Sequence, residues 1–207
     1  MNIQEQFYHY ITENNLEKVK LLLQDKKLDP CYKNNFAIRY STQNRNLEMI
    51  KLLIKDKRID PSANDNWIIR FTSEYANPEF IKLILKDKRV NPSVRDNWAI
   101  QIASYNNNIE VVKLLLKDSR VNPADNSNSA LYGAAKYGHF NIIKLLLNDN
   151  RVDPSDNKNI SIKDAYYYKH NNIVQCLWQD ERVRNSLVND DKELYNKLIL
   201  QDNVEKF

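Results

Sequence analysis

Apolar residues recur along this chain at the spacing of amphipathic helices, and proline interrupts the pattern at regular intervals. In residues 108–118 (NIEVVKLLLKD), Ile109, Val112 and Leu115 fall on one face of a helix and the lysines fall outside it. Residues 97–107 (NWAIQIASYNN) form a shorter segment of the same kind, whose small residues would let helices approach closely. The pattern predicts pairs of short helices.

The interruptions follow one repeated phrase, Asp-x-Arg-Val-(Asp/Asn)-Pro, in which the arginine and the valine have close equivalents in some copies. Its prolines are spaced by 31 residues, at Pro30, Pro61, Pro92, Pro123 and Pro154. Proline cannot continue a helix and forces the residue before it into extended geometry, so each phrase should leave the helix as a projecting loop. Because one helix pair has too little core to fold alone, the units must stack.

Residues 128–157 (NSALYGAAKYGHFNIIKLLLNDNRVDPSDN) resemble an ankyrin repeat. Ala134-Ala135 match the paired alanines of that family, and Gly138-His139 match its inter-helix turn. The threonine and proline of the family's T-P-L-H motif are missing throughout, and the period is shorter than the usual length of about 33 residues. With this period and its repeated phrase, the chain is most similar to the ankyrin arrays of giant amoeba-infecting DNA viruses.

The resemblance implies an all-α ankyrin-repeat solenoid of stacked helix-turn-helix units joined by projecting loops that contain proline. We expect a single domain over residues 1–207, closed at its C-terminal end by a helix around Asp191–Gln201 with Leu194, Leu198 and Ile199 on its inner face. The expected parts are an N-terminal capping repeat (1–30), five full repeats (31–61, 62–92, 93–123, 124–154 and 155–185) and a C-terminal capping helix (186–207).

In an ankyrin array, the first helix of each pair lines a concave face that binds the partner. Alignment to the family assigns two neighbouring positions late in each first helix to this face, and half of them are tyrosine. Tyrosine combines a large contact area with a polar tip, which suits protein recognition. The alternative is that these tyrosines only pack between repeats. The predicted binding residues are Gln43, Asn44, Glu74, Tyr75, Tyr105, Asn106, Lys136, Tyr137, Tyr167 and Tyr168.

The repeated phrase is interpreted as a structural splice that ends one helix pair and launches the next. Its arginine follows a helix C-terminus, where a cation can bond the last carbonyl groups, and its aspartates can meet the arginines. A ladder of ion or ligand sites is the less favoured alternative. The predicted splice residues are Asp56, Arg58, Asp87, Arg89, Asp118, Arg120, Asp149 and Arg151.

The composition argues against catalysis and against a membrane span. Two glycines in 207 residues leave no Gly-rich phosphate loop. The three histidines and two cysteines have no metal-ligand spacing, and Cys176 is interpreted as a small core residue. We therefore predict no catalytic residue, no metal and no cofactor. The N-terminus lacks a signal pattern and no apolar run is long enough to cross a membrane, which favours the cytoplasm.

The sequence thus predicts a monomeric, non-enzymatic protein–protein interaction module. Its partner would be an unidentified protein, in the host cytoplasm if the chain is viral. Nucleic-acid binding is the first alternative, with Arg39, Arg70 and Lys163 beside the tyrosines, although the acidic loop residues argue against it. The second alternative is an adaptor to a ubiquitin ligase, which would need an additional C-terminal domain.

Overall fold

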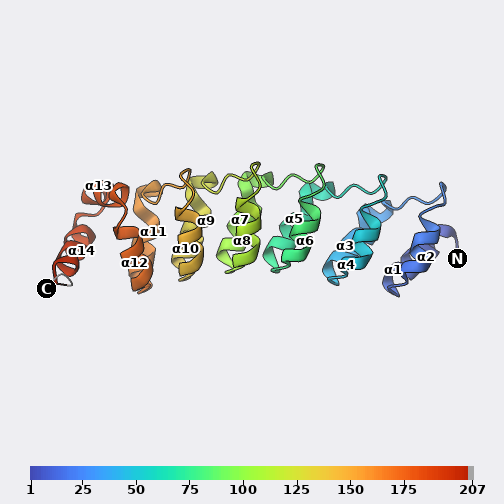
Figure 1. The fold of residues 1–207 in the computed structure, drawn as a ribbon, viewed down its shortest axis with the longest axis horizontal. Coiled ribbons are helices and arrows are strands. Elements are labelled where there is room, and N and C mark those ends of the chain that lie inside the picture. Colours follow the sequence, from blue (N-terminus) through green and yellow to red (C-terminus); the bar gives the residue numbers. More distant parts are fainter. Residues whose placement is uncertain (205–207) are drawn as a thin grey trace. The chain divides into compact units, whose positions relative to one another are not determined.

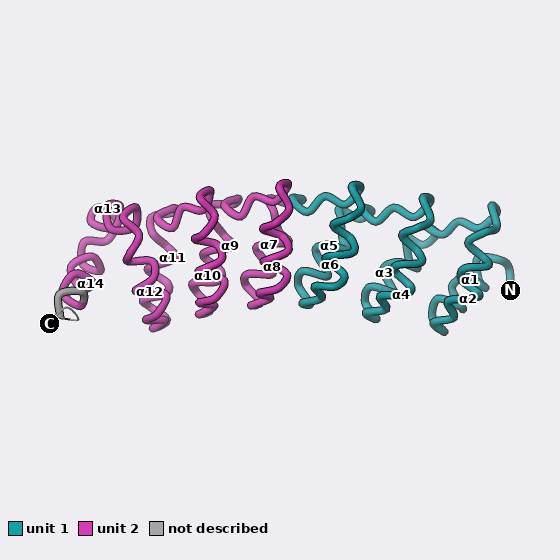
Figure 2. Tube along the Cα trace, viewed as in Figure 1, with its two compact units in different colours: residues 1–94 teal, residues 95–207 magenta. Residues whose placement is uncertain are grey.

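The computed structural model describes residues 1–204, and it describes side-chain burial for residues 1–201. Every regular element in the described part of the chain is an α-helix, as the sequence predicts. The helices belong to two compact units, residues 1–94 and 95–207, which are coloured separately in Figure 2. No helix in the described range is long and apolar enough to cross a membrane.

Unit 1 contains three helix pairs. The first helices pack side by side in chain order, as do the second helices. Each second helix begins at an asparagine whose side chain accepts a hydrogen bond from a backbone N–H of the first turn, at 3.0 to 3.2 Å. The pairs are α1 (Ile3–Thr12) with α2 (Leu16–Leu22), α3 (Tyr32–Gln43) with α4 (Leu47–Leu53), and α5 (Ala63–Glu74) with α6 (Pro78–Ile84) (Figure 1).

Unit 2 continues the same arrangement and ends with two further helices. Helix α9 packs against α11, and the second helices α8, α10 and α12 pack against one another in order. The pairs are α7 (Val94–Tyr105) with α8 (Ile109–Leu116), α9 (Asp125–Lys136) with α10 (Phe140–Leu147), and α11 (Asp156–Tyr167) with α12 (Asn171–Trp178). The last helices are α13 (Glu181–Asp190) and α14 (Lys192–Val204).

The core of each unit follows the 31-residue period. Every second helix from α4 to α12 buries two adjacent apolar residues and a third one turn later, such as Ile142, Ile143 and Leu146 in α10, whereas α2 buries only Val19. Small residues of the first helices are also fully buried, including Ala134 and Ala135 in α9. Because these side chains are short, the two helices of a pair lie close together, and burial of the apolar faces stabilises the stack.

Each first helix from α3 to α11 contains a left-handed turn near its start, which the sequence analysis did not predict. Three consecutive residues have φ between 49° and 61°, as in Asn126, Ser127 and Asn128. The left-handed conformation is costly for residues with a Cβ atom, and asparagine tolerates it best among the types with a polar side chain. The third residue is a buried asparagine in all five turns: Asn35, Asn66, Asn97, Asn128 and Asn159.

Three of the buried asparagines, Asn66, Asn97 and Asn128, each join their own turn to the following loop. The Oδ1 of Asn128 accepts a hydrogen bond from the Asp153 N–H at 3.1 Å, and its Nδ2 donates to Asp156 at 2.8 Å. The Oδ1 of Asn66 in unit 1 likewise accepts from the Asn91 N–H at 2.6 Å. These bonds use the side chain that lies nearest to the strained backbone, so the left-handed turn and the following loop stabilise each other.

The C-terminal part departs from the repeat. The residues after Val183 are Arg184 and Asn185, where earlier copies have Asp or Asn followed by proline. Without the proline a helix can form there, and α13 begins at Glu181 with Asp180 as its N-cap. Helix α14 includes the predicted segment Asp191–Gln201 from its second residue onward; Leu194 and Leu198 are buried in it, whereas Ile199 is only half-buried.

Candidate partner-binding surface

The predicted binding residues lie at the C-terminal ends of the first helices, beside the short turns within each pair. In unit 1, Gln43 is the last residue of α3 and Asn44 is its C-cap; Glu74 and Tyr75 have the same places in α5. Tyr75 is 48% exposed and ends a row of stacked rings along α5. In that row Trp67 lies 4.6 Å from Phe71, and Phe71 lies 4.5 Å from Tyr75, measured between ring centroids.

In unit 2, Tyr105 and Tyr137 form a pair that joins α7 to α9. Their ring centroids are 4.4 Å apart and their hydroxyl oxygens 2.7 Å apart, yet the residues remain 45% and 43% exposed. The hydrogen bond to Tyr137 raises the pKa of the Tyr105 hydroxyl. The Tyr105 side chain lies next to Gly133 of α9, where an added Cβ would be 3.6 Å from Tyr105 Cβ, an ordinary contact distance.

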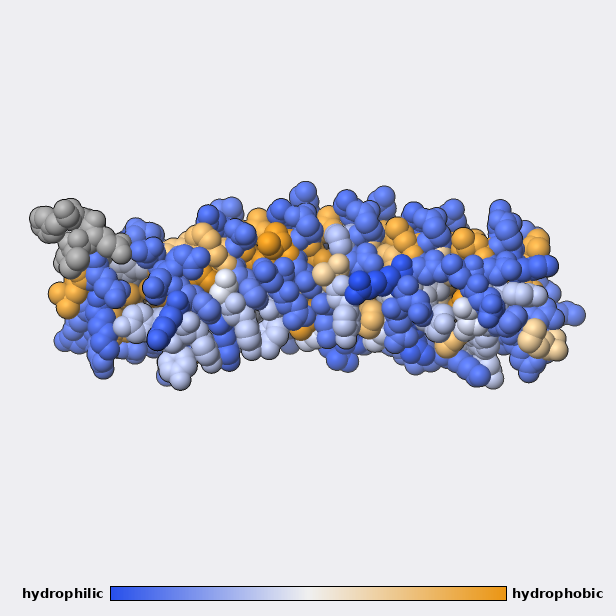
Figure 3. All heavy atoms as spheres, turned by 90° about the horizontal axis from the view of Figure 1, so that it is seen from below, coloured by the Kyte–Doolittle hydropathy of each residue, from blue (hydrophilic) through white to orange (hydrophobic). Residues whose placement is uncertain are grey.

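The remaining predicted positions of unit 2 are also at its surface. Tyr167 is 75% and Tyr168 is 46% exposed, with ring centroids 5.0 Å apart. Lys136 is half-buried, and its Nζ donates to the Tyr132 hydroxyl at 3.2 Å. Asn106 is exposed. Figure 3 views the molecule from below the view of Figure 1. It shows mostly hydrophilic side chains in both units, with hydrophobic side chains scattered among them.

Two histidines fix the helix ends that carry these tyrosines. The Nε2 of His139 lies 2.9 Å from the carbonyl oxygen of Tyr105, and the Nε2 of His170 lies 3.0 Å from that of Lys136. Carbonyl groups at a helix C-terminus lack an intrahelical donor, so a ring N–H satisfies them. No group of three or more potential metal-binding side chains occurs in the described residues, and these two histidines serve the backbone instead.

The cations invoked for nucleic-acid binding also contact backbone. The Nε atoms of Arg39 and Arg70 donate to carbonyl oxygens of the left-handed turns, at 2.8 Å to Asn34 and 3.0 Å to Asp65. The Nζ of Lys163 lies 3.4 Å from the carbonyl oxygen of Asp190. A guanidinium that stabilises its own loop is less available to a phosphate, which weakens the nucleic-acid alternative.

The predicted splice residues of unit 1 form paired turns. In Asp56–Arg58 the carboxylate accepts the Arg58 backbone N–H at 3.0 Å and both Nε and Nη2 of the guanidinium, the latter at 2.6 Å. The same guanidinium donates to the carbonyl oxygens of Leu23 and Leu28 in the preceding turn, at 2.6 and 2.9 Å. Asp87 and Arg89 repeat this geometry, and Arg89 donates to the carbonyl of Ile59 at 2.7 Å.

Unit 2 contains the same pairs. Arg120 binds Asp118 through Nε and Nη2 at 2.9 and 2.6 Å. Arg151 binds Asp149 in the same way, and its Nη1 donates to the carbonyl of Val121 at 2.8 Å. In each pair the guanidinium holds the pKa of the carboxyl group below its ordinary value. The phrase therefore contains a charge-assisted contact that joins successive turns.

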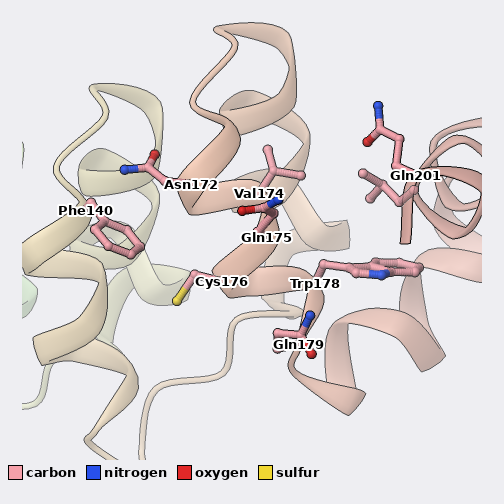
Figure 4. A pocket seen from close by; sticks show the side chains of 9 residues that line it. Phe140, Asn172, Val174, Gln175, Cys176, Trp178, Gln179 and Gln201 are labelled. Atoms are coloured by element: carbon pink, nitrogen blue, oxygen red, sulfur yellow. The ribbon is translucent and has the colours of Figure 1, made fainter. Parts of the chain in front are cut away.

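Sequence reasoning missed the buried asparagines described above and a cavity beside the second helices α10 and α12. The cavity, about 420 Å³, lies at α10, α12 and α14 (Figure 4). Phe140 and Cys176 are on one side of the view and Trp178 and Gln201 on the other. Cys176 is only half-buried, so its interpretation as a core residue was incomplete; burial nevertheless raises the pKa of its thiol.

Comparisons with known proteins agree with this geometry. The family model of ankyrin repeats, in three copies, matches residues 69–158. A search of the curated proteins gives no match. Among solved structures, the crystal structure of EF0377, described as an ankyrin repeat protein, superposes with a TM-score of 0.72 at 22% identity, covering 84% of this chain and 96% of that chain.

At this level of identity, the likeness to EF0377 is one of fold. Ankyrin repeats are generally protein-interaction modules and are typically non-enzymatic. Residues 69–158 therefore match the ankyrin repeat family model, and the chain has the fold of an ankyrin repeat protein.

Proposed function

We propose that the chain is a non-enzymatic module that binds a partner protein or peptide through the ends of its first helices. The observation that carries the proposal is the group of exposed tyrosines at the C-terminal ends of α7, α9 and α11: Tyr105, Tyr137, Tyr167 and Tyr168. Their rings pack against one another in pairs but leave a large part of each ring in solvent. An aromatic surface of this kind is typical of interface hot spots.

Pre-organisation supports this reading. The Tyr105–Tyr137 hydrogen bond and the contact with α9 restrict both side chains before any partner arrives. A side chain that is already ordered loses less conformational entropy on binding, so more of its contact area contributes to affinity. The backbone beneath it is held by His139.

We propose the same organisation for the rest of the chain as the sequence predicts. Residues 1–30 would serve as an N-terminal cap, the five 31-residue segments as full repeats, and residues 186–207 as a C-terminal cap. We also propose that the chain is monomeric and that, if the chain is viral, its partner is a host protein in the cytoplasm. An adaptor function would follow only if the bound partner belonged to a ubiquitin ligase.

The test selects a ligand from a random peptide library displayed on phage, with the purified chain as bait. The affinity of the best peptide is then measured by calorimetry for the chain and for Tyr105→Ala and Tyr137→Ala. Each variant should bind at least about 30-fold more weakly, corresponding to ~2 kcal/mol for a hot-spot residue. Both should unfold within about 0.5 kcal/mol of the parent because the side chains are surface groups.

Tyr32→Ala is the matched control. Tyr32 is 49% exposed at the start of α3, away from the C-terminal ends of the first helices. Its replacement should not change the affinity for the selected peptide. If the tyrosine variants lose stability but keep their affinity, the tyrosines are packing residues and the proposal is wrong. The nucleic-acid alternative predicts instead that polynucleotide displaces the peptide and that binding weakens steeply with salt.

A further inference from the structure

The lysines of unit 1 gather on the turns that follow its second helices. Each of the three turns carries two exposed lysines, and none of the six forms an ion pair within the described residues. We call this set the lysine edge. It consists of Lys26 and Lys27 after α2, Lys55 and Lys57 after α4, and Lys86 and Lys88 after α6.

The arginine contacts make the lysine edge continuous. Arg58 donates to carbonyl groups of residues 23–28, so the turn after α4 lies directly against the turn after α2. Arg89 donates to the carbonyls of Lys57 and Ile59, which places the turn after α6 against the turn after α4. Three lysine-bearing turns thus follow one another in a row, about one helix-packing distance of ~10 Å apart.

The repeat itself shows that the fold does not require these charges. In unit 2 the positions equivalent to Lys55 and Lys57 are Asn148 and Asn150 after α10, on a turn with the same Asp–Arg pair. The net charge of the chain lies entirely in unit 1, which has sixteen basic and twelve acidic residues, whereas unit 2 has fifteen of each. A helix C-terminus favours a cation, but the turn after α10 keeps the same Asp–Arg pair without lysine at these two positions.

We propose that the lysine edge binds an acidic polypeptide segment, at a surface separate from the tyrosine surface of the proposed function. The charges form a row rather than a broad patch, which fits an extended chain that passes one turn after another. The arginines on the same edge are already bonded to aspartates and carbonyl groups, so no guanidinium fork is available for phosphate. No aromatic side chain lies within these three turns to stack a base.

The experiment measures binding of a fluorescein-labelled peptide of about twelve glutamates, long enough to span ~40 Å when extended. Full-length chain, the edge variant and a control variant are titrated into it at low salt, and anisotropy is recorded. The edge variant replaces Lys55, Lys57, Lys86 and Lys88 with Gln; the control replaces Lys158, Lys163, Lys169 and Lys192 with Gln, an equal change in net charge.

We expect the edge variant to bind the peptide at least about tenfold more weakly, since it loses four exposed ion pairs that each contribute a few tenths to 1 kcal/mol. The control variant should change the affinity for the peptide less than about twofold. An equal loss in both variants, or no binding by the parent chain, would overturn the proposal. So would tighter, edge-dependent binding of duplex DNA or of vesicles that contain phosphatidylserine.

Discussion

At the scale of single residues, the two glycines have different roles although both lie in one repeat. Gly138 has φ of +78°, and a Cβ there would lie 2.8 Å from the His170 ring. Gly133 lies inside α9, where an added Cβ would meet Tyr105 only at ordinary contact distances of 3.6 Å and more. Backbone strain and space are thus both limiting at Gly138, and neither is limiting at Gly133.

We therefore expect Gly138→Ala to lower the free energy of unfolding by about 1–2 kcal/mol, since a left-handed residue with a Cβ is strained and the ring must move. Gly133→Ala should be neutral or stabilising by up to ~1 kcal/mol because alanine is the better helix former. Urea denaturation of the two variants checks the difference. Equal effects would mean that neither the left-handed backbone at Gly138 nor its close approach to His170 is present in solution.

Arg151 tests the splice at a position where its contacts are complete. Arg151→Ala removes the paired contact with Asp149 and the bond to the Val121 carbonyl. The Arg151 side chain is 41% exposed, so solvent screening reduces the expected loss to about 1 kcal/mol. Lys113→Ala, which breaks only an exposed pair with Glu110, is the control and should cost less than ~0.5 kcal/mol in the same denaturation experiment. A loss at Arg151 no larger than at Lys113 would contradict the splice.

At the scale of elements, the left-handed turns are the feature that needs the most explanation. Ser127 is the middle residue of one such turn, is exposed, and has φ of 53°. Asn126 and Asn128 on either side are of a type that tolerates this conformation, but serine is not. The fold accepts the strain because the turn positions Asn128 for its bonds to the next loop.

Replacing Ser127 with glycine should raise the free energy of unfolding by up to about 0.5–1 kcal/mol, because it relieves the Cβ strain. Ser127→Val should lower it by ~1 kcal/mol or more, since a β-branched residue is the least suited to positive φ. Thermal unfolding followed by circular dichroism would show both shifts. Equal stability of Ser127→Val and Ser127→Gly would mean that the turn is not left-handed.

The helix pairs, the Pro loops and the period could be predicted because the spacing of apolar residues and of prolines is visible directly in the sequence. The left-handed turns could not be, since Asn128 reads as an ordinary polar loop residue until its partners Asp153 and Asp156 are known. The signal available in the sequence was an asparagine that recurs every 31 residues, from Asn35 to Asn159. The Tyr105–Tyr137 pair was also beyond reach because the two residues lie 32 positions apart and meet only through the packing of α7 against α9.

At the scale of the whole molecule, the repeated Asp–Arg pairs make stability depend on acid pH. Hydrogen bonds from the arginines lower the pKa of Asp118, Asp149 and Asp180 from their ordinary value. A carboxyl group whose folded pKa is depressed contributes stability above its unfolded pKa of about 3.9. That contribution is lost as the pH falls through the lower folded pKa, because the unfolded chain then binds more protons.

The melting temperature should accordingly fall as the pH drops from about 5 to about 2. A variant that combines Asp118→Asn, Asp149→Asn and Asp180→Asn should have a lower melting temperature at pH 7. Its melting temperature should fall less steeply in acid. Replacing the exposed Glu48, Glu79 and Glu110 with Gln is the control, and should leave the slope nearly unchanged. Parallel slopes for all three proteins would show that these pairs do not control acid unfolding.

The joint between turns has a consequence for how such a chain can change in length. Arg58 and Arg151 each donate to a carbonyl that lies 30 residues earlier, in the copy before their own. Both halves of the joint are therefore encoded in every 31-residue segment. A gene duplication that adds one whole segment supplies a matching donor and acceptor at once, whereas an insertion of any other length leaves one of them unmatched. Array length can thus vary in whole repeats without the joints having to be reinvented.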